Sequence, residues 1–174
     1  MNPQIEAKLR RIERLSVLFR GSCSVLIAIF GIATLVATMA TFAGRLTKLS
    51  TFGQSIALQD ATARAPVIVA GLVLVTGAVI IKALYHLRTL SGNYARRDFF
   101  TTDSVRQIRN FGVSCIFWGL VEVAWAFLPA VLPASPPVAV HLTIDSLLIG
   151  AVIVAISWLA EMAAVLREES ELTI

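Results

Sequence analysis

Four long stretches of the chain carry almost no charge, and their length constrains the fold more than any other feature. A helix rises about 1.5 Å per residue, so about 20 apolar residues cross the roughly 30 Å hydrocarbon core of a bilayer. The four stretches reach about that length and occupy residues 21–44, 66–87, 110–128 and 140–166. The pattern predicts four transmembrane helices.

The composition excludes most soluble alternatives. Hydrophobic residues make up 57% of the 174 residues and charged residues 15%, with a mean hydropathy of +0.79. An ordinary soluble domain has about 45–50% apolar and about 25% charged residues. A cytosolic globule, a disordered tail and a nucleic-acid-binding domain are therefore excluded. The first stretch exceeds the roughly 7–15 residues of a signal-peptide core, so we expect a retained helix.

Lysine and arginine are distributed unevenly between the two ends of the predicted helices. Twelve of them lie before the first stretch, in or beside the connector 88–109, or in the tail 167–174, and three lie between the first two stretches. Cytoplasmic loops carry such an excess. We therefore expect an all-α bundle of four transmembrane helices forming one domain over residues 1–174, with both termini cytoplasmic, in the inner membrane of a bacterium. The pI of about 9.6 then reflects topology and anionic lipid rather than nucleic acid.

Residues 1–20 are expected to contain a cytoplasmic amphipathic helix. Asn2 can cap this helix and Pro3 suits its first position. Apolar residues recur every three or four positions from Ile5 to Phe19, and charged residues occupy the other faces. Two roles stay open, a helix lying on the inner membrane surface and a docking helix for a protein partner.

The connectors between the stretches differ in character. Residues 45–65 carry apolar residues at helical spacing, which favours a short surface-bound helix interrupted near Gly53. In the cytoplasmic connector, Thr101 or Thr102 can begin a helix, and Ser104 with Gln107 fits a capping box. The last connector holds four of the six prolines and predicts a stiff turn. Glycines never occur at the G-x-x-x-G spacing, so that packing motif is not expected.

Two segments resemble a known family. The segment DFFTTDSVRQIRNFG at 98–112 is similar to a signature of Phe-Ser/Thr, Val, Leu/Ile-Arg and Gly, and LREESELTI at 166–174 is similar to a terminal Leu-x-Glu-Glu-x-x-Leu-Thr-Ile/Val tag. Both occur in the bacterial four-helix membrane family catalogued as domain of unknown function 2975. Asp98 stands where that family more often has glycine. The resemblance implies no established activity, but it implies small helix-turn-helix regulators as partners.

Glu122 is the strongest single candidate for a functional residue. It lies in the middle of the third stretch, where a charge is costly. Trp118 and Trp125 lie four residues before it and three after it, on the face that it shares. One interpretation is a proton or cation site. The other is a protonated carboxyl group hydrogen-bonded to an indole N–H or to a neighbouring helix.

Asp145 is the second intramembrane candidate. We expect it about one and a half turns inside the outer end of the fourth helix. It can face Glu122 and form a proton path with it, or cap its own helix, or reach the outer headgroups.

The remaining reactive residue types fit structural roles. Lys82 and His86 are four residues apart at the inner end of the second helix, where both can reach the interface. His86 and His141 are expected on opposite sides of the membrane, which disfavours haem ligation. Cys23 and Cys115 are expected on the reducing side and have no metal-binding spacing. No enzyme motif is present, so we expect no catalytic residue, no metal site and no cofactor.

Two functions follow from these features. The first is a non-enzymatic interaction, sensor or anchoring protein for a cytoplasmic partner, for example a helix-turn-helix regulator. The alternative is a small proton- or ion-coupled transporter or channel that uses Glu122 and Asp145. A homo-oligomer stays open, and direct nucleic-acid binding is not expected. The candidate docking residues are Arg96, Arg97, Phe100, Arg106, Arg109, Glu168, Glu169 and Glu171. The acidic tail either folds back against the basic connector or stays a solvated free end.

Overall fold

The computed structural model describes the backbone of residues 3–43, 48–51, 54–57, 65–96, 101–131 and 145–171. Side chains are described for residues 13–43, 65–96, 101–128 and 145–162. Within these ranges the elements are α1 (Pro3–Phe42), β1 (Lys48–Thr51), β2 (Gln54–Ala57), α2 (Ala65–Ala95), α3 (Thr102–Val131) and α4 (Asp145–Glu171). All four helices are long and apolar enough to cross a membrane, which confirms the all-helical, four-span fold class.

α1 joins two segments that the sequence pattern treats separately. The amphipathic residues before position 20 and the first apolar stretch form one helix of 40 residues. Proline occurs only at its first position, and Gly21, at the expected junction, costs only about 1 kcal/mol relative to alanine. Nothing in the local sequence is strong enough to end the helix between the two segments.

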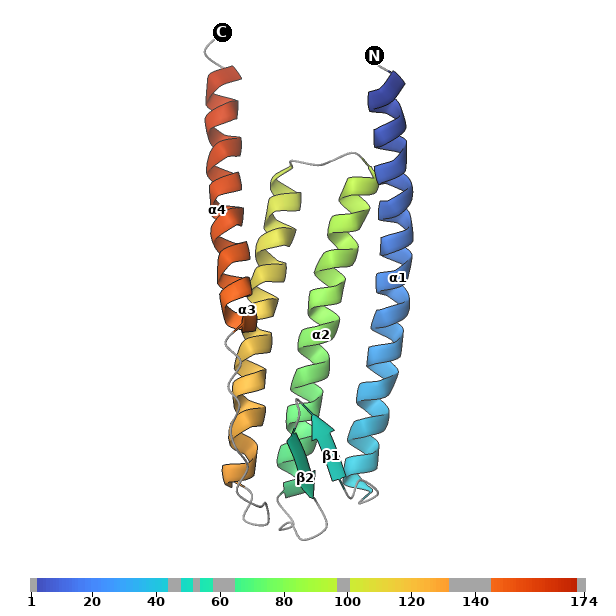
Figure 1. The fold of residues 1–174 in the computed structure, drawn as a ribbon, viewed down its shortest axis with the longest axis vertical. Coiled ribbons are helices and arrows are strands. Elements are labelled where there is room, and N and C mark those ends of the chain that lie inside the picture. Colours follow the sequence, from blue (N-terminus) through green and yellow to red (C-terminus); the bar gives the residue numbers. More distant parts are fainter. Residues whose placement is uncertain are drawn as a thin grey trace.

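The four helices stand side by side in chain order (Figure 1). α1 packs on α2, α2 on α3 and α3 on α4, and neighbouring helices run in opposite directions. α1 and α4 therefore stand at the two outer positions of the row. The N-terminal end of α1 and the C-terminal end of α4 lie at one end of the molecule, here called the terminal end. The strands lie at the other end, here called the hairpin end.

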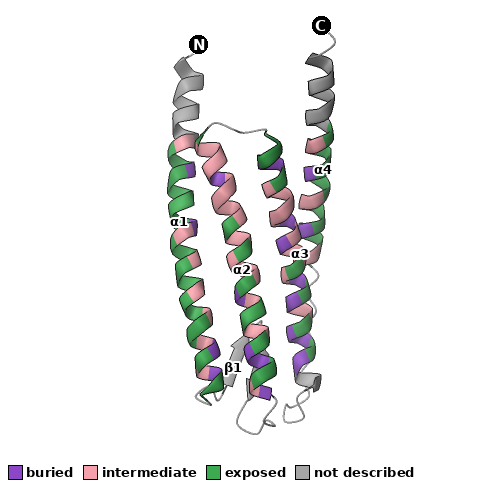
Figure 2. Cartoon of the chain, turned by 180° about the vertical axis from the view of Figure 1, so that it is seen from behind, coloured by how far each residue is buried: buried purple, intermediate pink, exposed green. Residues whose placement is uncertain are grey.

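Burial is highest on α3, although α2 also packs against two neighbours and its corresponding window is only 17% buried (Figure 2). The most apolar window of α3 is 39% buried, against 11% for the corresponding windows of α1 and α4. The exposed surface of the outer helices carries large apolar side chains such as Leu35, Leu148 and Leu159. A soluble protein rarely exposes apolar surface on this scale, whereas lipid covers it at no cost.

The first connector contains a β-hairpin, so the expectation of a surface-bound helix over residues 45–65 is wrong. β1 and β2 are antiparallel, with Leu49 opposite Ile56 and Ser50 opposite Ser55. Thr51 pairs with Gln54, so only two residues, one of them Gly53, separate the strands in the sequence, and this spacing is typical of a hairpin. Thr51 and Ile56 are β-branched and favour extended backbone. The helical spacing of the apolar residues was a weaker signal than this local chemistry.

Glycines bring α3 and α4 into close contact. A Cβ atom built on Gly150 would lie 2.8 Å from the carbonyl oxygen of Gly112 and 2.8 Å from the backbone nitrogen of Ile116. A Cβ atom on Gly119 would lie 2.5 Å from Cγ of Leu147. Gly112 and Gly119 are seven residues apart and share one face of α3. Close glycine packing is therefore present here without the G-x-x-x-G spacing.

Candidate functional site

Glu122 belongs to a stripe of side chains along one face of α3. Phe111, Cys115, Trp118 and Glu122 follow one another at spacings of four, three and four, which keeps them on one helix face. Glu122 lies nine residues before the end of α3 at Val131, or about 13 Å along the axis. That distance places it deep within the span.

One carboxyl oxygen of Glu122 is bonded and the other is not. The indole Nε1–H of Trp118 donates to Oε1 of Glu122 over 2.8 Å. Oε2 is buried and has no hydrogen-bond partner. Among the described side chains, the ion pair found joins Arg109 to Glu161 and does not involve Glu122. The site thus contains a half-satisfied carboxyl group inside the membrane-spanning part of the molecule.

Trp125, the other tryptophan predicted on this face, contacts α2 and makes no hydrogen bond to Glu122 among the described residues. The Trp125 side chain is only 3% exposed and turns towards α2. Its Nε1–H donates to Oγ1 of Thr76 over 2.9 Å. Trp125 lies three residues after Glu122, which places the two side chains about 60° apart around the α3 axis. That angle is enough for Trp125 to contact α2 instead of Glu122.

Asp145 is the first residue of α4, and its side chain is exposed. Residues 140–144 lie outside the described residues, so the expected depth of Asp145 within the fourth helix stays a prediction. A carboxylate at a helix N-terminus is favoured by the macrodipole. The close approach of Gly119 to Leu147 places Asp145 and Glu122 at similar heights, but no hydrogen bond between them is found in the described residues.

A cavity of about 300 Å³ lies between α2, α3 and α4. Three residues of the α3 stripe, Phe111, Cys115 and Trp118, line it. The other walls are mostly apolar and include Ile80, Leu84 and Leu87 of α2 and Ile149 of α4. Glu122 continues the stripe one turn beyond Trp118, so it stands next to the end of the cavity.

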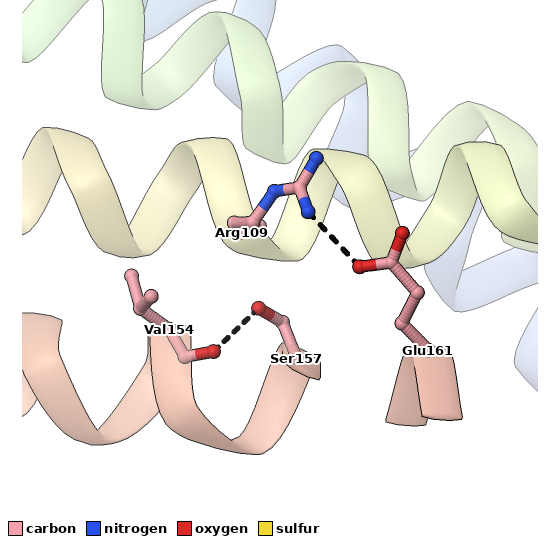
Figure 3. A network of polar contacts seen from close by, with 4 residues as sticks. All are labelled: Arg109, Val154, Ser157 and Glu161. Atoms are coloured by element: carbon pink, nitrogen blue, oxygen red, sulfur yellow. Dashed lines mark hydrogen bonds and ion pairs between the residues drawn. The ribbon is translucent and has the colours of Figure 1, made fainter. Parts of the chain in front are cut away.

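An ion pair joins α3 and α4 nearer the terminal end. Nη1 of Arg109 lies 2.9 Å from Oε2 of Glu161 (Figure 3). In the same view the Ser157 hydroxyl donates to the carbonyl oxygen of Val154 over 2.7 Å. Arg109 lies 22 residues before Val131, about 33 Å along α3, so the pair lies near one face of a bilayer core. The sequence did not predict this pair, because the acidic tail was the expected partner of Arg109.

The parts of α2 and α3 nearer the terminal end are joined by polar contacts. Nδ1 of His86 lies 2.8 Å from Oε1 of Gln107. The backbone N–H of Ser104 donates to Oγ1 of Thr101 over 3.3 Å, so Thr101 caps α3. The predicted helix start at Thr101 is confirmed. The capping box through Gln107 is wrong, because Gln107 contacts His86 of the neighbouring helix instead.

The candidate docking residues fall into three groups. Arg96 and Arg106 are exposed at the terminal end, and Arg109 is engaged by Glu161. Arg97 and Phe100 lie outside the described residues. The acidic residues 168, 169 and 171 continue α4 as helix, so through Glu171 the tail does not fold back on the connector. A helix already in progress extends at little cost, and no proline or glycine interrupts this one.

Metal-binding geometry is not found in the described residues. No group of three or more His, Cys, Asp or Glu side chains there could hold an ion. Cys23 is buried and Cys115 is half-buried, and both are free thiols.

Comparison with known proteins gives one match. A family model described as "Protein of unknown function (DUF2975)" matches residues 50–174. The match covers both segments that carry the resemblance in the sequence. No curated protein and no solved structure matches the chain.

Proposed function

The chain belongs to the DUF2975 family of proteins of unknown function, and from that premise we propose a non-enzymatic, multi-pass membrane protein that holds a protein partner at its terminal end. Its place is the inner membrane of a bacterium, with the terminal end in the cytoplasm. A small helix-turn-helix regulator is the kind of partner that the family resemblance implies.

The observation that carries this proposal is a pair of helical arms. Arg20 of α1 lies near Gly92 of α2, which places the end of α2 at Ala95 beside about residue 17 of α1. Residues 3–16 of α1 therefore extend about 20 Å past α2. The contact of Gly112 with Ile153 similarly leaves the last seven or so residues of α4 extending about 10 Å past α3. Figure 1 shows both arms at the same end.

The two arms differ in charge. Residues 3–16 contain four basic and two acidic residues, whereas residues 165–171 contain three acidic residues and one basic residue. α1 and α4 occupy the outer positions of the row. Two helical segments of opposite net charge at the same end of the molecule suit a partner that carries both signs of charge.

The distribution of basic residues supports a cytoplasmic terminal end. Eleven of the fifteen lysines and arginines belong to segments at or near this end, and Lys82 lies near the middle of α2. Short loops with such an excess stay in the cytoplasm during insertion. A partner that regulates transcription can reach the arms only from that side.

Site-specific photocrosslinking in cells tests the proposal. A photoreactive residue is placed at position 10 in the α1 arm, at 169 in the α4 arm, and, as a control, at 55 in β2. We expect a crosslink to one protein of defined mass from both arms and no such crosslink from position 55. Crosslinks that are identical at all three positions, or absent at both arms, would refute a partner at the terminal end.

A second candidate function rests on Glu122 alone. Its buried, unpartnered Oε2 suits a small proton- or ion-coupled transporter or channel. The exposed position of Asp145 supplies no second step for such a path. Ion flux in proteoliposomes that disappears in Glu122→Gln would favour this function, and flux equal to that of empty liposomes would exclude it.

A further inference from the structure

The cavity between α2, α3 and α4 has the size and character of a small-ligand site. Its volume of about 300 Å³ lies at the lower end of the range of roughly 300–1,000 Å³ for ligand pockets. Three helices form its walls, and nearly all of the lining is apolar. Such a cavity accepts an apolar group, but its lining alone does not distinguish one apolar group from another.

Glu122 lies on α3 one turn beyond Trp118, which is the last α3 residue in the lining of the cavity. The stripe of Phe111, Cys115 and Trp118 lines the cavity, and Glu122 is the next residue of that stripe. Its Oε2 is buried without a hydrogen-bond partner. A carboxylate in the membrane core is costly unless a positive charge lies beside it. The ion pair found among the described residues leaves Glu122 without a cation.

Trp118 connects the cavity with the carboxyl group. It lines the cavity, and its indole N–H also holds Oε1 of Glu122 in place over 2.8 Å. Tryptophan is the side chain whose ring face attracts cations most strongly. A positive charge at this end of the cavity would therefore meet a carboxylate and an aromatic ring together.

The structure assigns this cavity as a binding site for a small lipophilic organic cation. The Glu122 carboxylate is its counter-ion, the Trp118 ring is a wall beside the charge, and the apolar part of the ligand lies between the three helices. A metal ion does not fit, because no cluster of ligating side chains is found in the described residues. A lipid chain fills the apolar walls but leaves Oε2 of Glu122 unpaired. This site is independent of the partner proposed at the terminal end.

Two other charged groups lie near the cavity. Lys82 of α2 is exposed and, with Phe117, lines an adjoining cavity of about 220 Å³ that shares Val79 and Ser114 with the ligand cavity. Asp145 of α4 is exposed at the helix start, next to Ser146, which lines the ligand cavity. Asp145 is therefore the matched carboxylate for a control.

A pair of probes of nearly equal shape tests the assignment. The full chain is placed in nanodiscs of zwitterionic lipid, and binding of benzyltrimethylammonium is compared with that of neopentylbenzene, its neutral isostere. Uptake is measured relative to empty nanodiscs. The proteins compared are the unaltered chain, Glu122→Gln, Trp118→Phe and Asp145→Asn.

We expect the cation to bind the unaltered chain and to bind Glu122→Gln at least about tenfold more weakly, because the buried counter-ion is lost. Trp118→Phe should weaken binding of the cation by about threefold, and Asp145→Asn by less than about twofold. Neopentylbenzene should bind the unaltered chain and Glu122→Gln equally, which also shows that the cavity is intact in the variant.

Three results would overturn the assignment. The cation could bind Glu122→Gln as well as the unaltered chain, which would leave only an apolar cavity. Its binding could depend on Asp145 instead of Glu122, which would move the site to the start of α4. In the third result, neither probe binds above the level of empty nanodiscs, which would indicate a cavity filled by lipid.

Discussion

Hydroxyl side chains in the spans are satisfied within their own helices. Thr34, Thr38 and Thr41 of α1 donate to carbonyl oxygens four residues earlier, at 2.7–2.8 Å. Ser91 of α2 and Ser114 of α3 do the same at 2.8 and 3.0 Å. No water is available in a bilayer core, so a polar group must find its partner within the protein. These contacts let serine and threonine occupy membrane helices without joining one helix to another.

Thr76 is different because it also receives a hydrogen bond from another helix. It donates to the carbonyl oxygen of Leu72 and accepts from Nε1–H of Trp125. Thr76→Val keeps the shape and removes the acceptor, which leaves the buried indole N–H unsatisfied. We expect the free energy of unfolding to fall by about 0.5–1.7 kcal/mol, as for hydrogen bonds between membrane helices.

Unfolding of the purified protein in mixed micelles measures this loss, with Thr38→Val as the control. Thr38 is buried but bonds only within α1, so its replacement should change stability little. Equal losses in the two variants would contradict a specific role for the Trp125–Thr76 bond.

The Arg109–Glu161 ion pair is half exposed, which limits its contribution. The side chains are 36% and 44% exposed, and ion pairs at this exposure contribute about 0–1 kcal/mol in water. A double-mutant cycle compares Arg109→Gln, Glu161→Gln and the variant that carries both changes. We expect the double variant to lose no more free energy of unfolding than either single variant, because each single change already removes the ion pair. Losses that add in full would contradict a direct interaction. Arg106→Gln, an exposed arginine one turn earlier, should show no coupling to Glu161.

At the scale of the element, the first turn of α3 is capped by the side chain of Thr101. Thr101 Oγ1 accepts from the Ser104 backbone N–H, and its hydroxyl also lies 3.1 Å from that of Ser104. Thr101→Ala should lower stability by about 1 kcal/mol, because the N–H loses its partner. Thr101→Ser keeps the hydroxyl and should remain near the unaltered value. Thermal unfolding of both variants gives the comparison, and equal stability of the two would rule out the cap.

The contact between α3 and α4 depends on the absence of a side chain at Gly150. Its added Cβ would meet the backbone of Gly112 and Ile116 at 2.8 Å, and backbone atoms cannot move aside as a flexible side chain can. We expect Gly150→Ala to separate the helices and lower stability by about 1–3 kcal/mol. Gly71→Ala is the control, because nothing lies within 4 Å of a Cβ there.

The control variant should be as stable as the unaltered chain or slightly more so, since alanine favours a helix over glycine. Stabilities measured by unfolding in mixed micelles decide the matter. A loss in Gly71→Ala that matched the loss in Gly150→Ala would point to a general effect on glycine and not to the helix contact.

For the whole molecule, the even number of spans places both termini on one side. α1 begins at the terminal end and α4 ends there, and the hairpin lies at the other end. Which end faces the cytoplasm is set by the basic residues during insertion. The fold alone is compatible with either orientation.

Cysteine labelling in intact cells tests the orientation. In a background of Cys23→Ser and Cys115→Ser, single cysteines replace Arg106 at the terminal end and Ser55 at the hairpin end. A membrane-impermeant maleimide should label position 55 in intact cells and position 106 only after the membrane is opened. The reverse pattern would place the arms outside the cytoplasm and refute the proposed partner site.

Several parts of this protein follow from the sequence by itself. Stretches of about 20 apolar residues have one common solution in a bilayer, because an α-helix satisfies every backbone group internally. The four spans, the start of α3 at Thr101 and the bond between Trp118 and Glu122 depend on residues close together in the chain. Their geometry is set by helical periodicity, which a sequence displays directly.

Only the tertiary structure decided which groups meet across helices. Periodicity places Trp125 and Arg109 on faces of α3, but the relative height of two helices determines that they meet Thr76 and Glu161. That height depends on close packing, such as Gly112 against Gly150, and on no spacing within a single helix. The cavity beside Glu122 has the same origin, because three helices far apart in the sequence form its walls.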